Sequence, residues 1–128
     1  MSYKFQTTLQ LPFDDAVERV RQALDVFGFG VITEIDVKAV MKKKLDLEFK
    51  NYLILGACNP QFAHKALSQM DDIGLLLPCN VIVYETNDNQ VIVSTMKPTH
   101  LLGLVGSEEV TQVAQIVEKK LEDFILSL

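Results

Sequence analysis

The sequence has little proline and glycine, and it lacks any long apolar run. Of its 128 residues, four are proline and six are glycine, which is too few for a long linker or a disordered tail. No apolar stretch approaches the length of a membrane-spanning helix, and Met1–Gln6 contains no apolar signal core. These absences predict one compact domain over residues 1–128, located in the cytoplasm, with no membrane partner.

Positive charge is also scarce. Twelve Lys and Arg residues against seventeen Asp and Glu residues give a formal net charge of −5. The resulting field repels nucleic acid and anionic membranes, so no nucleic-acid partner is expected. The one basic cluster, Lys42–Lys44, is followed by Asp46 and Glu48, which indicates the solvated end of a helix rather than a binding patch.

Hydrophobic periodicity divides the chain into strands and helices without internal repeats. Period-two or continuous apolar patterns predict strands, and i, i+3, i+4 spacing predicts helices. The expected strands cover 3–10, 31–35, 47–55, 81–86 and 91–95, the expected helices cover 14–27, 36–45, 60–70 and 107–125, an extended path covers 73–77, and a loop covers 98–106.

Several helix starts carry specific capping residues. Asp36 and Ser107 each precede a helical apolar stripe, and Asn59 is followed by Pro60, a favourable first helical residue. Asn87–Gln90 separates two β-branched runs and is typical of a hairpin turn. The order of elements therefore favours an α+β fold, in which two long helices cover one face of a largely antiparallel sheet of about five strands.

Gly56–Asn80 contains both cysteines, each beside a proline and an asparagine. Cys58 directly precedes Asn59, the expected N-cap of the next helix, and a thiolate beside a helix N-terminus is stabilised, so its pKa should be lowered. The backbone N–H groups of residues 61–63 offer an alternative site for a small anion. Pairing of 53–58 with 75–79 as neighbouring strands would bring Cys58 close to Cys79.

The two cysteines match no specific redox or metal motif. Their spacing is not CxxC, and adding His64 and His100 gives only a loose set without zinc-finger spacing. A phosphate-binding loop of the GxxxxGK[ST] type is absent. Buried, purely structural cysteines are an equally open interpretation, and no metal site and no cofactor are assigned.

The runs Leu55–Pro60 and Ile73–Val81, with Ala63, Ala66–Leu67 and Tyr84–Glu85, resemble the signature of the bacterial and archaeal domain-of-unknown-function-302 family. The resemblance extends from the first helix to Pro98. It implies a fold that resembles the TATA-box-binding-protein-like fold, a curved antiparallel sheet with two long helices. It implies no activity, and the acidity of this chain argues against DNA binding.

Two functions of different kinds follow from these patterns. The first is a small-ligand, redox or metal-binding module centred on Cys58 and Cys79, with a small molecule or an anion as its ligand. Catalysis by Cys58 as a nucleophile would need a base, for which His64 is the only candidate nearby in the sequence. The residues expected at the site are Cys58, Asn59, Pro60, His64, Pro78, Cys79 and Asn80.

The alternative is a homo-oligomeric structural or interaction protein, with a homodimer as the expected assembly and no chemistry at the cysteines. It rests on the apolar segment Thr99–Val105, which as a loop would need cover from a core or a partner.

Overall fold

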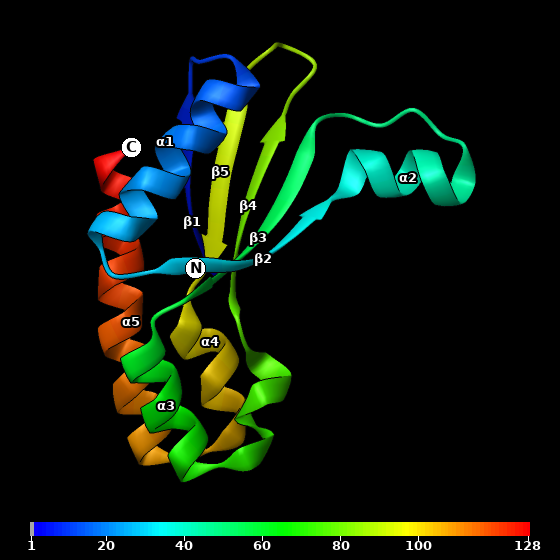
Figure 1. The fold of residues 1–128 in the computed structure, drawn as a ribbon. Coiled ribbons are helices and arrows are strands. Elements are labelled where there is room, and N and C mark those ends of the chain that lie inside the picture. Colours follow the sequence, from blue (N-terminus) through cyan, green and yellow to red (C-terminus); the bar gives the residue numbers. More distant parts are fainter. Residues whose placement is uncertain (1) are drawn as a thin grey trace.

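A five-stranded sheet forms the centre of the computed structural model, which describes residues 2–128 (Figure 1). The strands lie in the order β1-β5-β4-β3-β2, and each neighbouring pair is antiparallel. The strands are β1 (Lys4–Leu9), β2 (Gly30–Asp36), β3 (Tyr52–Cys58), β4 (Cys79–Glu85) and β5 (Val91–Met96). The helices are α1 (Phe13–Val26), α2 (Val37–Leu45), α3 (Pro60–Gln69), α4 (Pro98–Leu102) and α5 (Glu108–Ser127), with 3-10 turns η1 (Asp71–Leu76) and η2 (Gly103–Val105).

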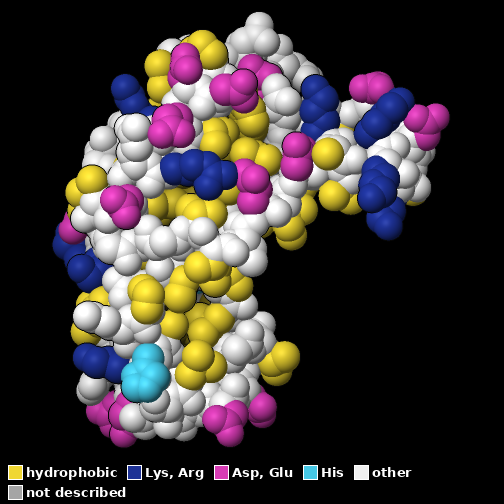
Figure 2. Space-filling model, in the orientation of Figure 1, with side chains coloured by type: hydrophobic (Ala, Val, Ile, Leu, Met, Phe, Trp, Pro, Cys, Tyr) yellow, Lys and Arg dark blue, Asp and Glu magenta, His cyan; other side chains and the backbone are white. Residues whose placement is uncertain are grey.

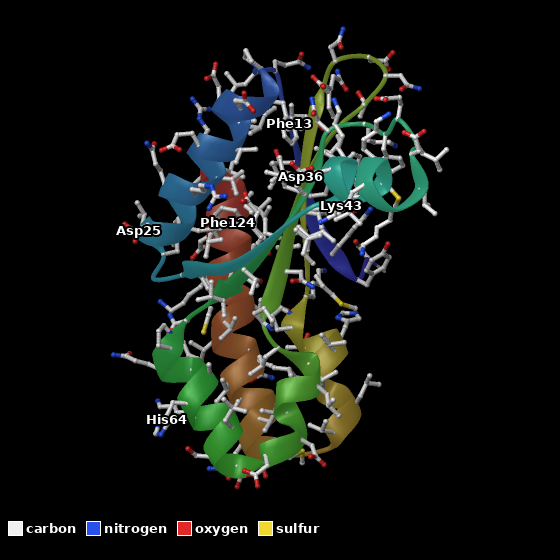
Figure 3. All side chains as sticks on the ribbon, turned by 45° about the vertical axis from the view of Figure 1, so that its right-hand side comes forward. Phe13, Asp25, Asp36, Lys43, His64 and Phe124 are labelled. Atoms are coloured by element: carbon white, nitrogen blue, oxygen red, sulfur yellow. The ribbon has the colours of Figure 1, made fainter. Side chains whose placement is uncertain are left out.

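The main core lies between one face of the sheet and the helices α1 and α5. Alternate residues of β3, β4 and β5 point to this face, as the period-two geometry of a strand requires. Phe124 of α5 is fully buried there, and Figure 3 shows it between its helix and the strands. The expected α+β fold, with two long helices on one face of an antiparallel sheet, is confirmed.

A second, smaller core forms a helical lobe beyond the end of the sheet. It contains α3, η1, α4 and η2 packed on the N-terminal half of α5, the helix that runs along both parts of the molecule (Figure 1). Ala66, Ile73, Leu102, Val110 and Ala114 are buried in this second core.

Two segments of this lobe differ from the sequence-based expectation. The stretch 73–77, expected to be extended, belongs largely to η1, and 98–106, expected to be a loop, contains α4 and η2. Ile73 and Leu102 are buried against α5. Short helical turns point these side chains inward, and some of their backbone N–H groups donate hydrogen bonds to nearby carbonyl oxygens of the same turn.

The predicted caps are confirmed. The Asp36 side chain accepts from the Ala39 N–H at 3.0 Å, and the Ser107 hydroxyl accepts from the Val110 N–H at 3.3 Å. The hairpin between β4 and β5 is also confirmed, with Asn89 in the left-handed region at φ 61°. The two caps therefore set where α2 and α5 begin, and the turn sets where β4 ends and β5 begins.

Candidate ligand-binding site

An apolar cavity of about 290 Å³ lies where the sheet meets the helical lobe. Figure 2 shows the molecule hollowed on this side, with hydrophobic side chains bordering the hollow. Residues from β2, β3, β4, α3, η1, α4 and α5, and from the segments beside them, contribute to its wall. The lining residues are Phe29, Ile32, Ala57, Cys58, Asn59, Phe62, Ala63, Leu67, Gly74, Leu77, Pro78, Cys79, Leu102, Val113 and Val117.

The pairing of β3 with β4 brings both cysteines to this cavity. Ala57 lies directly opposite Cys79 in the register, and Cys58 is the next residue of β3. Both cysteines are free and half-buried. The expected proximity of the two ends is therefore present, but its geometry differs from the prediction, because the partner of β3 is the strand Cys79–Glu85 and not residues 75–79.

The environment of Cys79 changes the acidity of its thiol. Burial raises its pKa to about 11, and the nearby Cys58 adds to this shift, because ionisation of both sulfurs would place two negative charges close together. Cys79 is therefore a neutral thiol at neutral pH. A neutral thiol is a weak nucleophile and a poor metal ligand.

Asn59 is the polar residue at this site, and both of its oxygen atoms already accept hydrogen bonds from the first turn of α3. Its Oδ1 accepts from the Phe62 N–H at 3.4 Å, and its carbonyl oxygen accepts from the Ala63 N–H at 2.9 Å. Asn59 and Pro60 thus begin α3 as the sequence predicts. Because two of the N–H groups expected to hold an anion are already paired, and no charged residue lines the cavity, the site suits an uncharged molecule.

Three of the expected site residues lie away from the cavity. Pro60 is exposed at the first position of α3. His64 points outward from α3 (Figure 3), and its Nε2 lies 3.5 Å from the Ser68 Oγ. Asn80 is exposed and pairs in the register with Gly56, on the opposite side of β4 from Cys79. The structure therefore brings together Cys58, Asn59, Pro78 and Cys79 only.

No metal centre is formed by the part of the chain that the structure describes. Within residues 2–128, no group of three or more His, Cys, Asp or Glu side chains is arranged to hold a metal ion. His100 is exposed on α4 and does not line the cavity. In the same range, no helix has both the length and the apolar character needed to cross a membrane.

Most of the wall consists of apolar residues that the sequence analysis did not assign to a site. Phe29, Phe62, Val113 and Val117 come from three separate segments and carry no chemical signature that distinguishes a cavity wall from a core. The available signal was indirect: Phe62 and Val113 lie on helical apolar stripes beside a capped helix start. Only the packing of the lobe against the sheet reveals that these residues leave a space between them.

The comparisons with known proteins identify a family and similar solved structures. Residues 5–128 match the family model described as "Domain of unknown function DUF302". A crystal structure of an uncharacterized conserved DUF302 protein from Bacillus stearothermophilus superposes with a TM-score of 0.88 at 28% sequence identity, covering 98% of this chain and 97% of the other. No curated protein matches the chain.

Proposed function

The chain belongs to the DUF302 family, and from the geometry of its cavity we propose that it binds a small, uncharged apolar molecule between the sheet and the helical lobe. The observation that carries this proposal is the cavity itself, with a volume of about 290 Å³ and a wall without charged residues. Ligand sites in proteins are typically concave, mostly apolar and supplied with a few polar groups that set orientation.

The volume limits the size of the ligand. An apolar cavity of about 150 Å³ binds benzene, so this cavity has roughly twice that space. A bicyclic aromatic compound or a medium-length acyl chain would fit such a volume. Phe29 and Phe62 are the aromatic residues of the wall, which favours an aromatic or otherwise flat apolar ligand.

The two thiols and Asn59 would then contact the bound ligand without reacting with it. Cys79 would contribute a neutral, polarizable sulfur, in keeping with its raised pKa of about 11. That pKa weakens the redox and metal-binding forms of the hypothesis, because disulfide exchange and metal coordination both need a thiolate. Because the Oδ1 of Asn59 already caps α3, its Nδ2 group would supply the polar contact that orients the ligand.

The alternative, an interaction protein using residues 99–105, has less support. Leu102 is buried in the core of the helical lobe, and Val105 packs against the same cluster. Leu104 is the large apolar side chain of this segment that remains mostly exposed, at 78%. The apolar side chains of this segment therefore pack largely within their own chain and do not need a partner to cover them.

Titration with N-phenyl-1-naphthylamine, an uncharged bicyclic probe whose fluorescence rises in apolar surroundings, tests the proposal. Ala63→Leu places extra methyl groups in the cavity and should abolish probe binding. Ser68→Leu adds a leucine to the same helix at an exposed position outside the cavity, and this control should bind like the wild type. Equal binding by both variants would place the probe elsewhere and contradict the proposal.

Labelling of the thiols gives a second, independent readout. Because Cys58 and Cys79 both line the cavity, a saturating concentration of the probe should slow their reaction with a maleimide in the native protein. Ser68→Leu should show the same protection, and Ala63→Leu should show none from the probe. Saturable probe binding without any thiol protection would rule out this cavity as the site.

A further inference from the structure

A smaller cavity, called the annex here, lies beside the cavity between the sheet and the helical lobe. It has a volume of about 80 Å³, and the end of η1, the start of β4, the end of β5 and the helix α4 contribute to its wall. Apart from Asn80, the described residues that line the annex are apolar. A space of this character excludes charged groups and suits a short alkyl chain.

Three residues line both the annex and the larger cavity. Pro78 and Cys79 lie at the start of β4, and Leu102 is the last residue of α4. Because each of them borders both spaces, the two cavities are separated by a partition that is one residue thick. Leu102 is buried in the core of the helical lobe, and the Pro78 ring lies against Gly56. Cys79 has the smallest side chain of the three, with a single sulfur atom beyond its Cβ.

Hydrogen bonds hold the backbone on both sides of Cys79. The Thr95 Oγ1 donates to the Asn80 carbonyl oxygen at 3.0 Å and ties the start of β4 to β5. On the other side, the Leu77 N–H donates to the Gly74 carbonyl oxygen at 3.3 Å. A shorter side chain at position 79 should therefore leave an open space, because the surrounding backbone cannot readily move in to fill it.

We propose that Cys79 sets the maximum length of the ligand by closing the annex off from the larger cavity. This inference rests on the proposed function, because it concerns which apolar molecules the same site accepts. Benzene in a cavity of about 150 Å³ corresponds to roughly 25 Å³ for each carbon atom. On that scale the larger cavity holds about eleven or twelve carbons, and the annex would hold about three more. The ligand class is thus an uncharged molecule whose alkyl end stops at the Cys79 thiol.

Competition between 4-n-alkylphenols and N-phenyl-1-naphthylamine tests the proposal. These phenols are uncharged at neutral pH, and the series from the butyl to the nonyl compound spans the predicted limit. Each methylene group that enters an apolar space should raise the affinity by about fourfold. For the wild type this rise should stop near the hexyl compound, because longer chains meet Cys79.

Cys79→Ala removes the sulfur atom from the partition and should let the rise continue. The nonyl compound should then bind about tenfold or more tighter than the hexyl compound, whereas the wild type should bind the two about equally. Cys58→Ala is the matched control, because it removes the same atom from the larger cavity at a residue that does not line the annex. It should move the limit by only about one methylene group, the space of the lost sulfur.

A second substitution tests whether the longer chains enter the annex itself. Leu101 lines the annex but not the larger cavity, so Leu101→Ala enlarges the annex behind the partition. Added to Cys79→Ala, it should extend the rise further, and with Cys79 in place it should not lengthen the limit. Circular dichroism establishes that each variant is folded. Leu102→Val, which shortens the partition from α4, makes the same test if Cys79→Ala does not fold.

The outcomes separate this inference from the proposed function. If the phenols displace the probe but Cys58→Ala and Cys79→Ala give the same limit, Cys79 does not set the length, although the cavity still binds apolar molecules. A wild-type affinity that keeps rising to the nonyl compound would likewise overturn the role of Cys79. Failure of the wild type to bind both the probe and every phenol would contradict the proposed function as well.

Discussion

The side chain of Thr33 occupies the space that any side chain at Gly56 would need. The two residues are paired in the register of β2 and β3, and the Thr33 Oγ1 lies too close to the position of an added Cβ for both atoms to fit. Pro78 closes the same space from the other side, with its Cγ 2.8 Å from that position. The glycine therefore allows β2, β3 and the start of β4 to meet closely beside the cavity.

Gly56→Ala should destabilise the protein by about 1–3 kcal/mol, because Thr33 and Pro78 must both move to admit a methyl group. The free energy of unfolding in urea measures the effect. Gly103→Ala is the matched control, since no atom lies within 4 Å of its added Cβ and its φ of −62° suits alanine. The control should be between neutral and about 1 kcal/mol more stable.

The coupling between the two residues can be measured separately. Thr33→Ala removes the hydroxyl that blocks position 56, so the double variant should recover part of the stability that Gly56→Ala loses. Strict additivity of the two substitutions would show that Pro78 and the backbone, rather than Thr33, set the restriction.

Ionisation of Cys79 should make the protein less stable at high pH. Its pKa rises from about 9.0 to about 11 on folding, so its contribution is fully present below pH 9 and is lost as the pH rises through 11. A shift of this size corresponds to about 2–3 kcal/mol. Other groups also titrate in this range, so the measured quantity is the difference between the wild type and Cys79→Ala in urea unfolding from pH 7 to 11. A constant difference over that range would contradict the assigned shift.

Asn59→Ala should cost about 0.5–2 kcal/mol, because it removes the oxygen that accepts from the Phe62 N–H at the start of α3. Asn59→Ser retains a capping oxygen and should recover most of this loss. Thermal unfolding followed by circular dichroism measures both. Equal destabilisation by alanine and serine would mean that the amide, rather than the cap, is what the site requires.

Glu118→Ala should destabilise the helical lobe by about 1–3 kcal/mol. One carboxylate oxygen of Glu118 on α5 accepts from both the N–H and the hydroxyl of Thr99, at 3.1 and 2.6 Å, and thereby ties α4 to α5. Glu122→Ala is the control on the same helix, because it removes only an exposed ion pair with Lys119, worth about 0–1 kcal/mol. Chemical unfolding compares the two, and equal effects would contradict a special role for the Thr99 contact.

The candidate site was predicted only in part. The two Cys-containing ends were expected to meet, and Cys58, Asn59, Pro78 and Cys79 do line one cavity. His64 was included because it is near Cys58 in the sequence, but it projects from the outward side of α3. Nearness in the sequence does not place two side chains together in space, because the packing of α3 decides which of its faces turns towards the cavity.

The sequence by itself determined the features that depend on neighbouring residues. The caps at Asp36, Asn59 and Ser107, the turn at Asn87–Gln90 and the amphipathic stripe of α5 all follow from interactions within a few positions. Tertiary structure decided the features that depend on distant partners. Residues 73–76 and 98–105 form short helical turns because they pack on α5, and the cavity exists because the lobe and the sheet meet without filling the space between them. An apolar residue has the same local pattern whether it faces a core, a cavity or a second chain, so only the position of its distant neighbours separates these three roles.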